Sequence, residues 1–211
     1  MPTSMVTHAL QQATAVGDLA TVRQCMAAYV YDHTLRWSAV HRAAAVDALV
    51  SVLTTFPRDA RVVGGALCAL VHVSACLQRA AVPIVTVVEA AERHAATDVV
   101  VVRAAARLLS HHVASPQKLE QLPLVTECTA RWVGTYPRDG DLAFWAAHVL
   151  CHAAGQEPND VQAAHGSMGQ GRIDAALVAG ATASRVIEVQ VGGQPWQAFL
   201  LTNLFPRLRS A

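Results

Sequence analysis

Apolar residues recur at helical spacing along most of the chain, and four short segments repeat one pattern. Each begins with two apolar residues and ends in a histidine or an asparagine. The four segments are Ala69-Leu70-Val71-His72, Leu108-Leu109-Ser110-His111, Val149-Leu150-Cys151-His152 and Leu200-Leu201-Thr202-Asn203. Their spacing of roughly 40 to 50 residues is typical of stacked helical repeats. The pattern predicts an all-α protein, an α-solenoid of about five repeated units.

A second element precedes each of these segments at a near-constant distance. It combines a small or helix-kinking residue with an apolar helical stretch, in Ala45–Val50, Ala81–Val85, Leu122–Val125 and Ile173–Leu177. Two recurring elements with fixed separation predict that each unit contains a pair of helices. The predicted units are approximately residues 4–40, 41–79, 80–118, 119–171 and 172–211, in a single domain.

Turn signals separate the elements. Thr55–Asp59 and Thr135–Asp139 share a Pro-Arg-Asp sequence and lie two repeat lengths apart, with Ala95–Asp98 midway between them. In each turn the aspartate is placed to cap the following helix, and in two of them a proline ends the preceding one. A Gly17-Asp18 turn predicts one helix from Met5 to Ala15 and a second from Asp18 to about His33.

Three segments fit the repeat pattern less simply. Val99–Val102 has strand propensity, but it follows the predicted Asp98 cap, so we expect a helix there. Val186–Val191 alternates apolar and polar residues before two glycines, which predicts a strand or a distorted turn. Residues 155–172 are rich in glycine and without helical period, which predicts an inserted loop that either contacts a partner or is merely tolerated.

Composition narrows the class of protein. The chain is 53% hydrophobic but 5% aromatic, so its core must be built largely from alanine and valine. A formal net charge of +1 argues against binding to nucleic acid or to an anionic membrane surface. The uncharged run Val62–Gln78 contains two glycines and several polar residues, which indicates a buried helix.

The cysteines and the N-terminus predict where the protein is located. The five cysteines have no paired spacing, which favours reduced thiols. The first residues resemble neither a secretory signal nor a transit peptide. We therefore expect an intracellular, cytoplasmic protein, with a cytoskeletal location as the narrower alternative.

These features together resemble the armadillo-repeat family, with HEAT repeats as the nearest alternative. Ala81-Val82-Pro83 is similar to the signature that opens the second helix of an armadillo unit. Ala66–Val73 and Phe199–Leu204 are similar to its third-helix core, Ala-x-Trp-Ala-Leu-x-Asn. The resemblance implies a right-handed solenoid whose third helices line a concave groove, where a Trp and an Asn of each unit bind an extended peptide.

The resemblance also implies which residues would line that groove. The Asn place is occupied by His72, His111, His152 and Asn203, and the Trp place by Cys68, Arg107, His148 and Phe199. A histidine both donates and accepts hydrogen bonds, so it can replace Asn in binding a peptide backbone. The alternative is that these imidazoles bond neighbouring helices. The expected partner-binding residues are His72, Arg107, His111, His148, His152, Phe199 and Asn203.

The expected function is that of a non-enzymatic scaffold that binds an extended segment of another protein, with no cofactor and no small-molecule substrate. A structural subunit of a larger cytoskeletal or axonemal assembly is one version of this function. The alternative is a metal-binding or catalytic module that uses His148, Cys151 and His152, since Cys and His are the usual zinc ligands. Against it, Cys151 and His152 would point about 100° apart on a helix.

Overall fold

The computed structural model of the 211-residue chain describes residues 3–31, 38–74, 82–112, 121–136, 138–153, 190–191 and 194–195. For residues 147, 150–153 and the four last ones, it describes the backbone alone. Nearly all of this described part is helical, which confirms the predicted all-α class. Among the described helices, none combines the length and apolar character that crossing a membrane requires.

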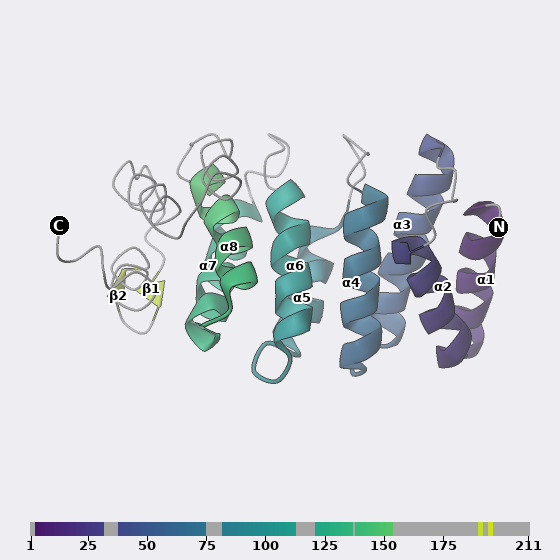
Figure 1. The fold of residues 1–211 in the computed structure, drawn as a ribbon, viewed down its shortest axis with the longest axis horizontal. Coiled ribbons are helices and arrows are strands. Elements are labelled where there is room, and N and C mark those ends of the chain that lie inside the picture. The colour runs from purple at the N-terminus through teal and green to yellow at the C-terminus, as the bar shows by residue number, and fades with distance from the viewer. Residues whose placement is uncertain are drawn as a thin grey trace. The chain divides into compact units, whose positions relative to one another are not determined.

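Eight helices occur in the described residues (Figure 1). They are α1 (Thr3–Val16), α2 (Leu19–Tyr31), α3 (Ala39–Thr55), α4 (Ala60–Ser74), α5 (Ile84–Glu92), α6 (Val99–His112), α7 (Leu122–Thr135) and α8 (Gly140–Ala153). The helix expected at Val99–Val102 is confirmed, because these residues form the first turn of α6.

The described part of the predicted fifth unit is not helical. The strands β1 (Gln190–Val191) and β2 (Gln194–Pro195) form an antiparallel pair, in which Gln190 is opposite Pro195. A strand therefore forms at the end of the Val186–Val191 segment. The other residues of that segment and the predicted 155–172 loop lie outside the described residues.

The chain divides into two compact units, Met1–Leu108 and Leu109–Ala211. In the first unit α1 contacts α2 and α3 contacts α4, so that consecutive helices form pairs. The pairs also contact each other, α1 with α3, α2 with α4, and α3 with α5. The first helices of the pairs thus form one layer, and α2 and α4 belong to the other.

Helix α4 is the centre of the first unit. Most of its residues are buried, including Val62, Leu67 and Leu70, which have no exposed surface. It contacts α2, α3 and α5 and therefore has apolar neighbours on several sides. This burial confirms the buried helix predicted for the uncharged run that begins at Val62.

The predicted aspartate caps are all present. Asp59 Oδ1 accepts a hydrogen bond from the Val62 amide at 3.0 Å, and Asp139 Oδ1 accepts one from the Leu142 amide at 2.8 Å. Asp98 Oδ1 accepts from the amide of Val100 at 2.9 Å. Each carboxylate satisfies an amide that has no partner within its helix, and so it fixes the residue at which the helix begins.

The first turn of the chain depends on a glycine. Gly17 has φ of 76°, a left-handed conformation that favours glycine. The following amide, that of Asp18, donates to the Ala13 carbonyl at 2.9 Å and closes the end of α1. Asp18 then caps α2 through the amides of Ala20 and Thr21, as predicted.

Three polar interactions join segments of the first unit that are far apart in the sequence. Tyr29 donates its hydroxyl hydrogen to Thr7 Oγ1 at 2.9 Å inside the α1–α2 pair, and burial raises the pKa of Tyr29 to about 12. His94 Nε2 lies 3.0 Å from the Pro57 carbonyl oxygen, to which it must donate because that oxygen can only accept. Arg23 and Asp59 form an ion pair at 2.9 Å.

In the second unit α7 packs against α8. Trp132 of α7 has no exposed surface and is the largest of the fully buried side chains in the described residues. Leu142 and Val149 of α8 are also completely buried, so each helix turns an apolar face inward. The backbone of β1 contacts α7.

Replacement of Asp98 by alanine should lower the free energy of unfolding by about 1 kcal/mol, because the first amides of α6 lose their acceptor. Asp98→Asn keeps a side-chain oxygen at that place and should cost much less. Urea unfolding followed by circular dichroism measures both variants. Equal losses for alanine and asparagine would show that the hydrogen bond is not the source of stability.

Stability should also decrease in acid through Asp59. The hydrogen bond from the Val62 amide, together with the Arg23 charge, holds the pKa of Asp59 below its ordinary value of 3.8. The unfolded chain then binds a proton more readily than the folded one, so this contribution is present above the ordinary pKa and is lost as the pH falls. In urea titrations below about pH 5, Asp59→Asn should lose less stability than the unmodified chain.

Candidate binding groove

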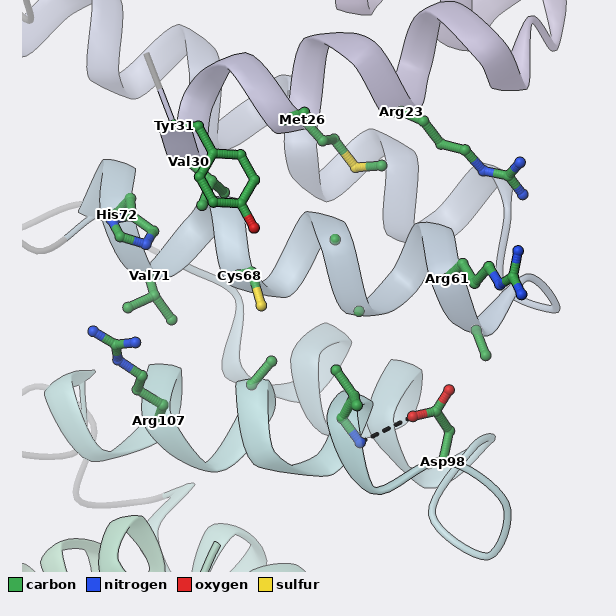
Figure 2. A pocket seen from close by; sticks show the side chains of 16 residues that line it. Arg23, Met26, Val30, Tyr31, Arg61, Cys68, Val71, His72, Asp98 and Arg107 are labelled. Atoms are coloured by element: carbon green, nitrogen blue, oxygen red, sulfur yellow. Dashed lines mark hydrogen bonds between the residues drawn. The ribbon is translucent and has the colours of Figure 1, made fainter. Parts of the chain in front are cut away.

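A groove of about 630 Å³ opens on the first unit, between α2, α4 and the first part of α6 (Figure 2). Its lining residues follow one face of each helix. They are Arg23, Met26, Ala27, Val30 and Tyr31 of α2, Ala60, Arg61, Gly64, Gly65, Cys68, Val71 and His72 of α4, and Val100, Ala104 and Arg107 of α6, together with Asp98.

The groove runs along the helices. On α4 the lining positions from Arg61 to His72 recur once per helical turn, at 61, at 64 and 65, at 68, and at 71 and 72, which places them in one stripe on the helix surface. The lining positions of α6 follow the same rule from Val100 through Ala104 to Arg107. The groove therefore extends along these helix faces and spans three helices, α2, α4 and α6.

Two consecutive glycines in α4 form the floor of the groove. A Cβ atom built on Gly64 would lie 3.5 Å from Val101 Cγ2 of α6, an ordinary contact. A Cβ atom on Gly65 would lie 3.2 Å from Met26 Cε of α2, which is tight. The absence of a side chain at Gly65 lets Met26 of α2 approach closely, and the two glycines together leave the middle of the groove open.

The walls combine apolar and cationic side chains. Two large apolar side chains of the lining are exposed, Tyr31 at 75% and Val100 at 53%. Figure 2 shows Arg107 and His72 facing each other near one end of the groove, and Arg61 and Asp98 near the other. Asp98 is the capping residue of α6, so its Oδ1 is directed at that helix's own backbone.

Cys68 lies in the middle of the groove. Burial raises the pKa of its thiol, although the nearby positive charge of Arg107 acts in the opposite direction. The thiol is therefore protonated at neutral pH, when it is a small, weakly polar group and a poor nucleophile. Cys25, Cys68 and Cys128 form no disulfide.

The structure brings together some of the residues that the sequence predicted. His72 and Arg107, with Cys68, line the groove of the first unit. Two other predicted residues, His111 and His148, meet in the second unit around Trp145. The ring centroid of Trp145 lies 5.6 Å from that of His111 and 5.7 Å from that of His148.

Three predicted residues have no described side chain. The backbone of His152 belongs to α8, and Phe199 and Asn203 lie outside the described residues. Among the side chains that are described, no three His, Cys, Asp or Glu residues cluster as a metal site would require. Because the side chains of Cys151 and His152 are not among them, the described residues do not test the alternative of a metal site at His148, Cys151 and His152.

Sequence reasoning missed several residues of these sites. Met26 and Tyr31 come from α2, a helix on which no partner-binding residue was predicted. Phe144 and Trp145 lie one turn before His148 on α8, and the Phe144 ring centroid is 4.8 Å from those of both Trp145 and His148. A tryptophan followed by alanine is part of the armadillo core pattern, so the signal for Trp145 was present, but outside the chosen register.

Comparison of the chain with protein-family models, with curated proteins and with solved structures gives no match. The groove and its chemistry therefore carry the functional argument.

The floor of the groove gives a test of its packing. Gly64→Ala should raise the free energy of unfolding by about 0.5–1 kcal/mol, because alanine is the better helix former and its methyl group has room beside Val101. Gly17→Ala should instead destabilise the protein, since its positive φ strains any side chain. Urea unfolding compares the two variants, and a loss of stability in Gly64→Ala would mean that α4 and α6 are closer than described.

Proposed function

We propose that this protein is a non-enzymatic scaffold of armadillo-like helical repeats, a right-handed solenoid that binds an extended segment of a partner protein. The observation that carries the proposal is the groove between α2, α4 and α6. It lies between helices of successive pairs, the location at which a helical-repeat protein forms a binding surface. Two of its lining residues, His72 and Arg107, also occupy groove positions in the repeat register of the sequence.

The helix order supports the repeat part of this proposal. Pairs of helices recur along the first unit, and their members contact the corresponding helices of the neighbouring pair. Pro83 is the residue immediately before α5, where the resemblance expects a proline to open a second helix. The pairing of the described helices is also compatible with HEAT repeats, the alternative family. HEAT repeats would give the same kind of binding surface.

The chemistry of the groove supports binding rather than catalysis. The Cys68 thiol is protonated, and the Asp98 carboxylate is used in capping α6. Exposed Tyr31 and Val100 offer apolar surface to a partner, and the arginines offer directed hydrogen bonds. A protein segment can use both kinds of contact at once. We place the scaffold in the cytoplasm, as a subunit of a larger assembly such as a cytoskeletal one.

The proposal predicts that blocking the groove removes peptide binding. Ala27 lines the groove but is itself exposed, so Ala27→Trp should place an indole over the groove without disturbing the core. Peptides are first selected on the unmodified chain from a displayed random library. They should bind the Ala27→Trp variant at least about tenfold more weakly, because the loss of one contact worth about 1.4 kcal/mol raises the dissociation constant tenfold. Fluorescence anisotropy with labelled peptides measures the dissociation constants.

The matched control is Ala43→Trp, which adds the same indole at an exposed position of α3 that is not part of the groove. It should leave the dissociation constants unchanged, and circular dichroism should show the same helix content in both variants. If every selected peptide binds the Ala27→Trp variant as well as the unmodified chain, the groove is not the binding site.

A further inference from the structure

We draw no further inference here: the strongest candidate, the ring cluster of His111 on α6 with Phe144, Trp145 and His148 on α8, consists of rings that pack on one another, and nothing in the structure shows what covers its exposed side.

Discussion

The structure of the first unit depends on apolar burial shared between successive helix pairs. A single pair of helices cannot bury both of its apolar faces, so α1 and α2 need α3 and α4 beside them. The side chains at these contacts are mostly alanine, valine and leucine, and Ala45, Ala66 and Ala69 have no exposed surface. Small side chains let the helix backbones approach closely. The low aromatic content is therefore compatible with a fully packed core.

One face of the layer that contains α2 and α4 lies outside this packing between successive helix pairs. Every residue that α4 turns toward α3 and α5 is committed to packing, but the stripe from Arg61 to His72 faces the groove. Besides Val71, that stripe holds glycine, cysteine, histidine and arginine, whereas the packed sides hold mostly valine, leucine and alanine. A binding surface can differ in composition from the core only where packing does not determine the residue.

The capping aspartates determine where α4 and α6 begin, and therefore which of their residues face the groove and which face the core. Asp59 and Asp98 fix the first residues of α4 and α6 by accepting hydrogen bonds from their free amides. A shift of one residue would rotate a helix by about 100° and would carry Arg61 or Arg107 away from the groove. Asp59 also pairs with Arg23 of α2, so that one carboxylate both caps a helix and joins it to its neighbour.

The helical class and the residues at which several helices begin could be predicted from the amino-acid sequence, because the signals involved are local. Apolar period, the capping aspartates, Pro57 and Gly17 act within a few residues of where they stand. The helix at Val99–Val102 followed from its Asp98 cap despite strand propensity. The same local signals placed His72, Arg107, His111 and His148 on helices at related positions.

Which of these residues meet, and with what, depends on how the helices pack. His72 and Arg107 share a groove with Tyr31 and Met26 of α2, whereas His111 and His148 surround Trp145 in the second unit. Repeat spacing indicates equivalent positions along the chain, but not the distance or the neighbours that packing gives them. The glycine floor shows the same limit. Gly64 and Gly65 weaken a helix locally, and only the packed structure shows that they lie opposite Val101 and Met26 of other helices.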